Sequence, residues 1–402
     1  MALIVFSSLF PSAATPVAGL FIRERMFRVD KHFPIIVVAP QSWSPLDRLI
    51  RRFRPSFRSP ALEYEVMDGV RVYRPRFLSI PGYLKRFDGR LMAAGARKVL
   101  KQLASQGEVS AIDAHFLYPD GYAASVLARE LDVPYVVTMR GSKDSFLVGT
   151  DREPMMRECI AHAQAVICVS ESLAHLATGT LGAAAAKTTV VGNGIDTERF
   201  RREPRELARD RLGIPGDATV LLSVGHLTDG KGFHRVIPLL PDLRKAFPKL
   251  TYVIVGGDPT HQNKEAELRQ LAEAHGVGDI VRLAGRQSPD ELRWFYSAAD
   301  LFVLATAYEG WANVFLESMA CGLPIVTTRV GGNEQVIPEP ALGTLVEFWD
   351  PQAFEAAIRR SLTATPNPDL LIEHARRHAW DRKIQELLQI LVRTASKSNH
   401  HN

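Results

Sequence analysis

The chain alternates between short apolar runs and longer amphipathic segments along most of its 402 residues. The apolar runs are continuous, which is typical of strands that are buried on both faces of a parallel sheet. The pattern therefore predicts an α/β fold with parallel sheets covered by helices. We expect strands at 2–6, 35–39, 111–114, 135–138, 166–169 and 188–191 in the first half, and at 219–224, 251–255, 281–283, 301–305, 325–328 and 344–346 in the second.

Between the strands, apolar residues recur at helical spacing. We expect helices at 88–103, 121–131, 233–247, 264–275, 289–298, 314–321, 351–362 and 380–394. A chain of 402 residues is too long for one hydrophobic core, so two domains are expected. The stretch 192–216 is rich in glycine, arginine and proline, which is typical of a linker. We predict domains at 1–195 and 196–378, and over 379–402 a helix that could pack back on the first domain, followed by a disordered tail.

Composition is ordinary for a soluble protein, with 46% apolar and 23% charged residues. The three cysteines, Cys159, Cys168 and Cys321, have no metal-ligand spacing. This suits a reducing compartment and favours neither a disulfide framework nor a zinc site. No apolar run approaches the ~18–20 residues that span a bilayer. The first residues resemble a strand more than a signal peptide, so we expect a cytoplasmic protein.

The net charge of +5 is unevenly distributed. Residues 41–110 contain 14 Lys and Arg against 6 Asp and Glu, a local charge of +8. The basic residues are densest in Arg48–Arg58, where Phe53 and Phe57 lie among the arginines. Such a surface suits an anionic partner: lipid, nucleic acid or a phosphorylated substrate. The patch lacks a recognised nucleic-acid module, so we expect an anionic membrane surface and no nucleic acid, with a solvated face as the alternative.

Two acids stand out in the stretch 305–333. Glu309 lies in a loop after an expected strand, and Glu317 lies one turn inside an expected helix that is apolar almost all round. A buried carboxylate needs a hydrogen-bond partner. Both acids can face a ligand at the helix N-terminus, where amides and the helix dipole favour an anion. They can act as acid and base, as nucleophile or as hydroxyl clamps; a capping acid with a satisfied core glutamate is the alternative.

Other candidates also follow expected strands. Glycines and Lys231 in the loop 224–233 are suited to a phosphate, although their spacing matches neither the P-loop nor the dinucleotide fingerprint. An ordinary glycine-rich turn is the alternative. His115 closes a strand of the first domain, where a structural histidine is the alternative reading. Arg140 and Lys143 follow the next strand and could bind phosphate or form a polar turn.

The run from Glu309 to Glu317, continued by Cys321-Gly-Leu-Pro and Val330-Gly-Gly-Asn, resembles the E-x7-E signature of retaining glycosyltransferases with the GT-B fold. That family includes bacterial capsule, lipopolysaccharide and teichuronic-acid glycosyltransferases. The resemblance implies two Rossmann-like domains with parallel sheets that face a cleft. It also implies transfer of a sugar from a nucleoside-diphosphate sugar, UDP being favoured, to a hydroxyl of a glycolipid or growing polysaccharide. The first domain would bind the acceptor, and no divalent metal is implied.

The resemblance also implies roles for individual residues. Glu309 would contact the sugar hydroxyls and Glu317 the ribose hydroxyls. Lys231 would bind the diphosphate and stabilise the leaving group. His115 would face the sugar from the first domain and, with Glu309 and Lys231, is predicted to be catalytic. The remaining predicted donor-binding residues are Gly19, Gly225, His226, Arg286, Gly310, Trp311, Ala312, Asn313 and Val314.

The chain departs from the family pattern at three places. His226 stands where the family usually has arginine before the lysine loop, and Arg140 stands where many members have histidine. We hypothesise that Arg140 supplies the positive charge missing at His226. Gln335 replaces a family glutamate, with Glu334 beside it, so that role is not assigned. The alternative functions are a GT-B-like sugar-nucleotide epimerase or phosphorylase, or a nucleotide-sugar-binding protein without turnover. The expected location is the cytoplasm, peripheral on the inner face of the cell membrane.

Overall fold

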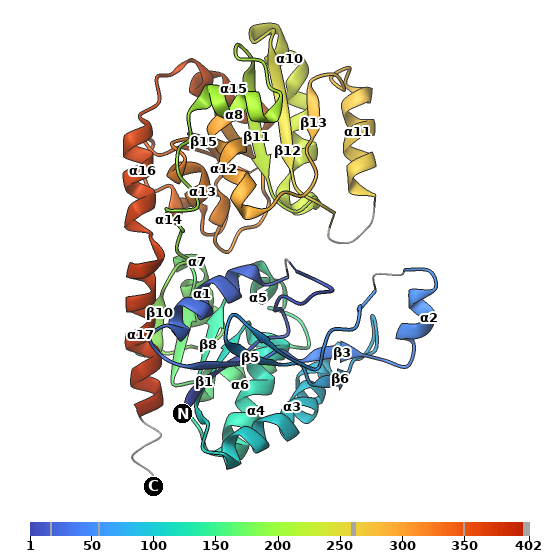
Figure 1. Cartoon of the computed structure of the whole chain (residues 1–402), viewed down its shortest axis with the longest axis vertical. Helices are drawn as coiled ribbons and strands as arrows, with labels where there is room; N and C mark the ends of the chain where they lie inside the picture. Colours follow the sequence, from blue (N-terminus) through green and yellow to red (C-terminus); the bar gives the residue numbers. More distant parts are fainter. Residues whose placement is uncertain (17, 55–56, 259–262, 349, 397–402) are drawn as a thin grey trace. The chain divides into compact units, whose positions relative to one another are not determined.

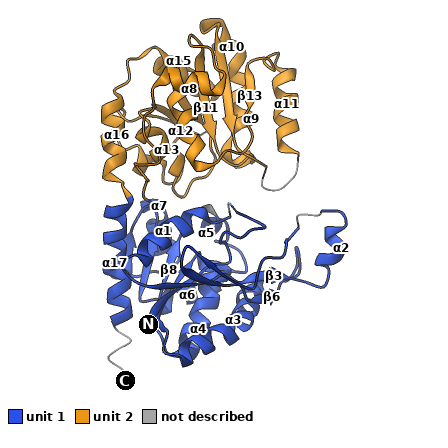
Figure 2. Ribbon diagram, viewed as in Figure 1, with its two compact units in different colours: residues 1–193, 380–402 blue, residues 194–379 orange. Residues whose placement is uncertain are grey.

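The computed structural model describes the whole chain except residues 17, 55–56, 259–262, 349 and 397–402. The chain forms two compact units, shown in different colours in Figure 2. Unit 1 comprises Met1–Asn193 and Trp380–Asn402, and unit 2 comprises Gly194–Ala379. The predicted boundaries, after residues 195 and 378, lie two residues and one residue away. The predicted disorder of the tail falls largely on 397–402, outside the described residues.

Unit 1 contains an eight-stranded sheet in the order β10-β9-β8-β7-β1-β2-β5-β4. Its strands pair in parallel, except that β4 runs antiparallel to β5. The register places Leu3 opposite Ile35 and Ala111, so the central strands are apolar and buried. The strands are β1 (Ala2–Phe6), β2 (Ile35–Val38), β4 (Tyr64–Met67), β5 (Val70–Tyr73), β7 (Val109–His115), β8 (Tyr135–Met139), β9 (Ala165–Cys168) and β10 (Thr188–Val190).

Unit 2 contains a six-stranded parallel sheet in the order β13-β12-β11-β14-β15-β16. The strand order reverses between β11 and β14, which is the switch point at which Rossmann-type domains bind ligands. The predicted fold class, two Rossmann-like α/β domains with parallel sheets, is confirmed. The strands are β11 (Thr219–Val224), β12 (Leu250–Val255), β13 (Val281–Leu283), β14 (Leu301–Leu304), β15 (Ile325–Thr328) and β16 (Thr344–Val346).

The last helix of the chain packs within unit 1, where it runs beside α1 (Figure 1). Ile384, Leu387 and Leu391 of this helix are buried in the same core as Met26 and Val29 of α1. The apolar stripe at helical spacing is therefore the buried face of the helix. The helices of unit 1 are α1 (Leu20–Asp30), α2 (Asp47–Arg51), α3 (Asp88–Ser105), α4 (Tyr122–Leu131), α5 (Ser142–Phe146), α6 (Glu153–His162), α7 (Glu171–His175) and α17 (Trp380–Ser396).

The helices of unit 2 cover both faces of its sheet (Figure 1). Two of them, α9 and α10, divide the single helix predicted at 233–247, because Ile237–Leu239 forms a 3-10 turn that contains a proline. The helices are α8 (Arg205–Leu212), α9 (Phe233–Val236), α10 (Leu240–Ala246), α11 (Lys264–Ala274), α12 (Pro289–Ala298), α13 (Asn313–Ala320), α14 (Asn333–Val336), α15 (Pro351–Thr363) and α16 (Pro368–Arg377).

The prediction of a linker over 192–216 is wrong for its second half, which forms α8 of unit 2. Arg209 in α8 is fully buried and donates from Nε to the carbonyl oxygen of Ala298 at 3.0 Å. Its Nη2 donates to Oδ2 of Asp300 at 2.9 Å. A charged, proline-flanked stretch looks like a linker in the sequence because an arginine that is buried with an acid partner carries no local signal.

Four strands between residues 41 and 78 were also missed by the sequence analysis. They are β3 (Gln41–Trp43), β4, β5 and β6 (Arg76–Leu78), of which β3 and β6 form a separate two-stranded sheet. Asp68 and Gly69 join β4 to β5, with φ angles of 48° and 88°. An Asp-Gly pair with two positive φ angles is typical of a two-residue hairpin turn, so this pair was the available signal. None of the described helices is long and apolar enough to cross a membrane.

Candidate active site

Three loops meet at the switch point of the unit 2 sheet. The loop after β11 contains Gly230, whose carbonyl oxygen accepts from the amide of Ala307 at 2.7 Å and from Oγ1 of Thr306 at 3.0 Å. The loop after β14 contains Glu309, whose carbonyl oxygen accepts from the amide of Gly332 at 3.1 Å. The loops after β11, β14 and β15 are therefore fastened to one another by hydrogen bonds that involve the backbone.

Glycines make this close packing possible. Gly232 has a φ of 77°, and a Cβ atom there would lie 1.9 Å from the carbonyl oxygen of Ala305. Gly331 has a φ of 54°, and its Cβ would lie 1.8 Å from the carbonyl oxygen of Glu309. A side chain at either position would both strain the backbone and push the loops apart. Gly232, one of the glycines predicted to allow close approach of a phosphate, thus packs the lysine loop against the backbone that follows β14, and Gly331 packs the loop after β15 against Glu309.

Lys231 and Glu309 are brought together although 78 residues separate them in the sequence. Nζ of Lys231 donates to Oε1 of Glu309 at 2.5 Å, and Oγ1 of Thr306 donates to the same oxygen at 3.2 Å. The Lys231 side chain is 25% exposed and the Glu309 side chain 8%. An ammonium group next to a carboxylate offers a donor for phosphate and an acceptor for hydroxyl groups in one place.

Glu317 lies on α13, which packs against α12. Glu317 is half-buried, less than the predicted buried acid, and its Oε2 accepts a hydrogen bond from the hydroxyl of Tyr296 at 2.8 Å. Burial raises the pKa of Glu317 to about 7, although the hydrogen bond from Tyr296 and the charge of Arg199 act in the opposite direction. The carboxyl group is therefore poised to change its charge near neutral pH.

Tyr296 is absent from the site residues predicted from the sequence. Tyr296 lies in α12 with its side chain on the buried face of the helix, next to Phe295. A tyrosine in an apolar helix face needs a partner for its hydroxyl, so its position was a signal. The identity of that partner depends on the packing of α12 against α13, which the sequence pattern does not specify.

The other predicted donor-binding residues of unit 2 lie near the same edge. His226 follows β11 and is an exposed residue, yet partial burial of its imidazole and the charges of Lys231 and Arg286 lower its pKa, which favours the neutral ring. Arg286 is exposed after β13. Trp311 is buried, and its Nε1 has no hydrogen-bond partner among the described residues. The remaining predicted donor-binding residues of unit 2 are near the same strand ends. The first, Gly225, directly follows β11. The loop before α13 contains Gly310 and Ala312, and the helix begins with Asn313 and Val314.

His115, Arg140 and Gly19 lie in unit 1. His115, at the end of β7, is completely buried, and its Nδ1 receives hydrogen bonds from Nε and Nη2 of Arg140 at 3.2 and 3.1 Å. Because Nδ1 accepts, the proton of the neutral ring resides on Nε2. Nη1 of Arg140 donates to Oδ1 of Asn193 at 3.0 Å. Gly19 precedes α1 with a φ of 68°, packed closely against the backbone of Leu9.

Two further charged groups surround His115. Asp113 is completely buried, and burial raises its pKa to about 6 against the charges of Arg140 and Arg25 and a hydrogen bond from Thr138. Burial also lowers the pKa of Arg25 to about 10, although Asp113 and Glu386 act in the opposite direction. For His115, burial and the two arginines together lower the pKa far below its usual value, so the ring is neutral. Arg25, Asp113, His115 and Arg140 form what we call the buried cluster.

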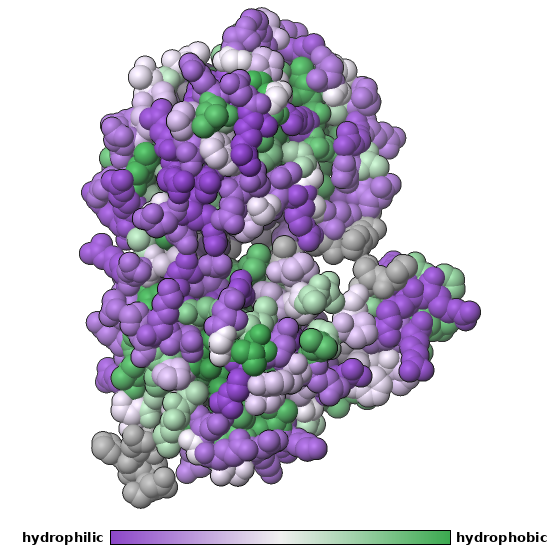
Figure 3. Space-filling view, viewed as in Figure 1, coloured by the Kyte–Doolittle hydropathy of each residue, from purple (hydrophilic) through white to green (hydrophobic). Residues whose placement is uncertain are grey.

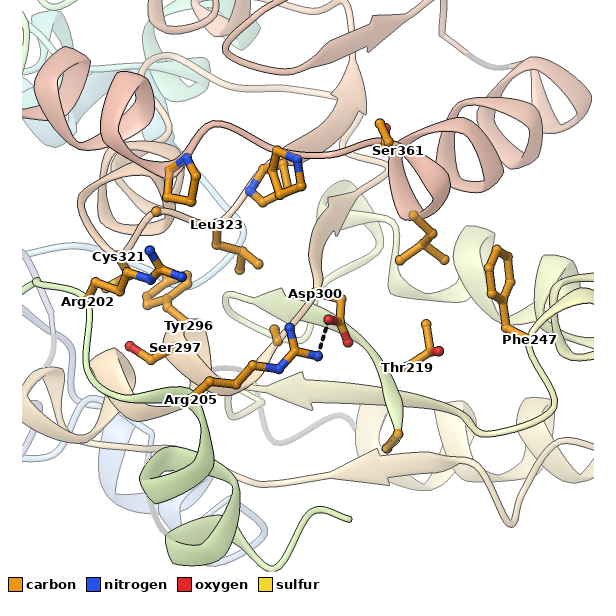
Figure 4. Close-up of a pocket in the computed structure, with 18 of the residues that line it drawn as sticks. Arg202, Arg205, Thr219, Phe247, Tyr296, Ser297, Asp300, Cys321, Leu323 and Ser361 are labelled. Atoms are coloured by element: carbon orange, nitrogen blue, oxygen red, sulfur yellow. Dashed lines mark ion pairs between the residues drawn. The ribbon is translucent and has the colours of Figure 1, made fainter. Parts of the chain in front are cut away.

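Two of the cavities that lie within single units bear on the predicted sites. A cavity of about 430 Å³ in unit 1 is lined by hydroxyl groups, including those of Ser12, Thr15 and Ser42, and by cations such as Lys143 and Arg152. A cavity of about 390 Å³ in unit 2 lies near the start of β11, β14 and β15, at the end of the sheet opposite the lysine loop (Figure 4). None of the predicted donor-binding residues lines the second cavity.

The described residues contain no group of three or more His, Cys, Asp or Glu side chains that could hold a metal ion.

Comparisons with known proteins assign both halves of the chain. Residues 204–378 match the family model "Glycosyl transferases group 1", and residues 30–199 match "Glycosyltransferase Family 4". The chain is 30% identical over 340 residues to the putative teichuronic acid biosynthesis glycosyltransferase TuaC of Bacillus subtilis, covering 83% of this chain and 82% of that one. It is also 30% identical over 328 residues to a D-inositol 3-phosphate glycosyltransferase of Acidothermus cellulolyticus, covering 77% and 72%.

Among solved structures, the fold is similar to that of HepE from Anabaena, which was determined in complex with UDP and glucose. The TM-score is 0.73 at 19% sequence identity, with 97% of this chain and 99% of that chain covered. At this level of identity the similarity shows the fold.

Proposed function

The chain belongs to the group 1 glycosyltransferases, and we propose that it transfers a sugar, with retention of anomeric configuration, from a UDP-sugar to a hydroxyl of a glycolipid or growing polysaccharide. The observation that carries the proposal is the Lys231–Glu309 pair at the switch point of a parallel sheet. It offers a cation and a carboxylate at the edge where such domains bind nucleotides. Retention is proposed from the E-x7-E pattern of Glu309 and Glu317.

In the proposed reaction, the bond between the anomeric carbon and the diphosphate breaks, and a bond to the acceptor oxygen forms. The nucleoside diphosphate leaves with the electron pair of the broken bond, and its leaving phosphate oxygen takes up the proton of the acceptor hydroxyl. Lys231 binds the diphosphate and stabilises the charge that develops on it. Glu309 accepts hydrogen bonds from sugar hydroxyls, and Glu317 accepts them from the ribose. The resemblance assigns His115 a contact with the sugar, and this assignment stays a prediction.

The donor is tested by a thermal-shift panel of UDP-, GDP- and ADP-sugars, because a ligand that binds the folded state raises the melting temperature. UDP is proposed because the similar HepE structure contains it. We expect UDP-sugars to give the largest rise. A larger rise with GDP- or ADP-sugars would overturn the choice of base, and no rise with any of them would contradict donor binding itself.

Turnover distinguishes a transferase from the alternatives. We expect UDP to be released only when an acceptor is present, and the new glycosidic bond to keep the donor's anomeric configuration by NMR. Formation of an epimerised nucleotide sugar would favour an epimerase. Transfer of the sugar to inorganic phosphate would favour a phosphorylase. Tight donor binding with no turnover on any acceptor would favour a binding protein.

The acceptor is proposed to belong to cell-surface polysaccharide synthesis because the chain is similar to TuaC. The cavity of unit 1 supports an acceptor that is rich in hydroxyl groups, since serine and threonine side chains line it together with cations. The similarity to a D-inositol 3-phosphate glycosyltransferase makes phosphorylated inositol a second acceptor to assay. A panel that contains both acceptor types decides between them.

We also propose that the segment around α2 docks on an anionic membrane. Leu46, Leu49 and Phe53 are 48%, 55% and 82% exposed, and the neighbouring Arg48 and Arg52 are exposed as well. Figure 3 shows hydrophilic and apolar side chains side by side on this segment. Apolar side chains next to basic ones suit an interface with anionic lipid.

The predicted patch Arg48–Arg58 is divided in the structure. Arg58 points inward, where Nη1 donates to the carbonyl oxygen of Ser79 at 2.6 Å and pairs with Asp47 at 3.4 Å. Residues 55–56 of the patch lie outside the described residues. The membrane-facing set is therefore Arg48, Arg52 and Arg54 with the exposed apolar side chains.

Liposome pelleting tests the membrane proposal. We expect phosphatidylserine vesicles to sediment the wild type and not a variant with serine at Arg48, Arg52 and Arg54. A control with serine at Lys98, Lys101 and Arg393 removes the same charge from exposed positions elsewhere in unit 1. Equal sedimentation of the wild type and the first variant would remove the membrane proposal.

A further inference from the structure

The hydrogen bond between Tyr296 and Glu317 links α12 to the predicted ribose-binding acid. The hydroxyl of Tyr296 donates to Oε2 of Glu317 at 2.8 Å. Within the part of the chain that the structure describes, this is the only hydrogen bond of the hydroxyl, and Oε1 of Glu317 has no hydrogen-bond partner. One carboxylate oxygen is thus held by the protein, and the other is left for a ligand.

The ring of Tyr296 is fixed by its surroundings. Tyr296 is 1% exposed, and its ring centroid lies 6.2 Å from that of Phe200 in an edge-to-face arrangement and 6.0 Å from that of Phe302. Phe302 in turn packs edge-to-face at 5.9 Å against Phe315, on the same helix as Glu317. Aromatic contacts of this kind hold the hydroxyl at one place. Tyr296 and Cys321 both line the cavity of unit 2, where Figure 4 labels them.

Few charged or titratable groups face the carboxylate of Glu317. Tyr296 approaches from α12, Arg199 from the segment before α8, and Cys321 from the end of α13 itself. On α16, which packs along α13, His374 bonds to the carbonyl oxygen of Val336 and Glu373 pairs with arginines of its own helix. Tyr296 is therefore the one neutral donor with a hydrogen bond to Glu317 among the described residues.

We propose that Tyr296 is a positioning residue for the donor: its hydroxyl holds Oε2 of Glu317 and keeps the carboxylate ionised, so that Oε1 accepts a ribose hydroxyl. The inference rests on the proposed function, because it assumes that Glu317 binds the ribose. The chemistry supports it, since a hydrogen bond to the charged form of an acid favours that form. Burial and the neighbouring Glu317 raise the pKa of Tyr296 far above its usual value, so Tyr296 remains a donor.

The direction in which donor affinity changes with pH follows from the charge of Glu317. The pKa of Glu317 is raised to about 7, so donor affinity should be high above pH 7 and fall as the pH drops below it. Loss of the Tyr296 hydroxyl removes an interaction that lowers this pKa, so the midpoint should move to higher pH. A rise of about one pH unit lowers the ionised fraction at pH 7 from half to about a tenth, which is about a fivefold loss of affinity.

The experiment is isothermal titration calorimetry with UDP-glucose from pH 5.5 to pH 9. A nucleotide sugar is used because a terminal phosphate would itself titrate near pH 6. The variants are Tyr296→Phe and, as a matched control, Tyr252→Phe. Tyr252 is also buried in unit 2, on β12, and its hydroxyl hydrogen-bonds to the hydroxyl of Ser223 at 2.8 Å. Both variants lose one buried hydroxyl and keep the ring.

We expect Tyr296→Phe to move the midpoint up by about one pH unit and Tyr252→Phe to leave it unchanged. A second Tyr296→Phe variant, made in a Glu317→Gln background, should show no pH-dependent loss, since the titrating group is gone. An unchanged midpoint in Tyr296→Phe, or an equal shift in both tyrosine variants, would overturn the inference. Failure of the wild type to bind any nucleotide sugar would instead contradict the proposed function.

Discussion

The carboxyl ends of the strands carry charged groups in both sheets. The two sheets differ in how far these groups are buried. In unit 2, Lys231 and Glu309 lie in loops that glycines fasten together, and both keep some contact with solvent. In unit 1, Asp113 and His115 belong to strand β7, and Arg140 directly follows β8; all three are buried. The partly exposed charges of Lys231 and Glu309 remain accessible to a ligand. The charged side chains of the buried cluster instead interact with one another. The comparison therefore favours unit 2 as the nucleotide-binding edge and assigns the buried cluster a structural role in addition to any contact with substrate.

The largest effect is expected for Lys231→Ala. Removal of a cation aimed at a developing negative charge typically costs 10²–10³ in rate, about 3–4 kcal/mol. The free energy of unfolding should fall by only about 1 kcal/mol, because the Glu309 carboxylate, 8% exposed, loses its cation. The measurement is kcat/KM for sugar transfer together with the melting temperature. Lys245→Ala, which removes an exposed lysine paired with Asp242, is the control and should keep full activity.

Arg140→Ala tests whether the buried cluster of unit 1 has a structural role. It removes both donors to Nδ1 of His115 and leaves Asp113 with Arg25 as its remaining cation in the cluster. Breaking a buried charge network by removing one partner costs about 3 kcal/mol of stability. Chemical denaturation measures this loss, with Arg129→Ala, which breaks the exposed pair with Glu158, as control. A loss in donor affinity without a loss in stability would show that the buried cluster is not structural.

A comparison of Gly331→Ala with Gly276→Ala should separate a steric clash in the site loops from the backbone strain of a positive φ angle. A Cβ at Gly331 would lie 1.8 Å from the carbonyl oxygen of Glu309, so the backbone at Glu309 or at residue 331 must shift. We expect a loss of about 2 kcal/mol in stability and a clear loss of activity. Gly276→Ala, with a φ of 66° and no atom within 4 Å of its Cβ, should cost about 1 kcal/mol and leave activity intact. Equal activity of the two variants would contradict the idea that loop fastening positions Glu309.

The fold was predictable because buried parallel strands are continuous apolar runs, and β1, β11, β13, β15 and β16 have the predicted bounds. Glu309 and Lys231 were singled out because they lie in loops after such runs, and Glu317 because it is an acid in an apolar helix; their roles stay predictions. The Lys231–Glu309 contact follows only once β11 and β14 are neighbours in the sheet. The partner of Glu317 and the burial of His115 depend on side-chain packing across helices and strands, for which a single sequence contains no periodic signal.

The smallest effect is expected for His226→Arg, which tests the hypothesis that Arg140 compensates for the missing family arginine. His226 lies in the lysine loop with a lowered pKa, so a guanidinium there adds a permanent charge and two donors for a diphosphate. We expect a three- to tenfold gain in affinity for UDP-glucose, about 1 kcal/mol, measured by calorimetry. His234→Arg on α9 adds the same charge nearby and should give a smaller gain. Because the guanidinium of Arg140 already bonds to His115 and Asn193, a gain in His226→Arg with unchanged affinity in Arg140→Ala would show that the compensation hypothesis is wrong.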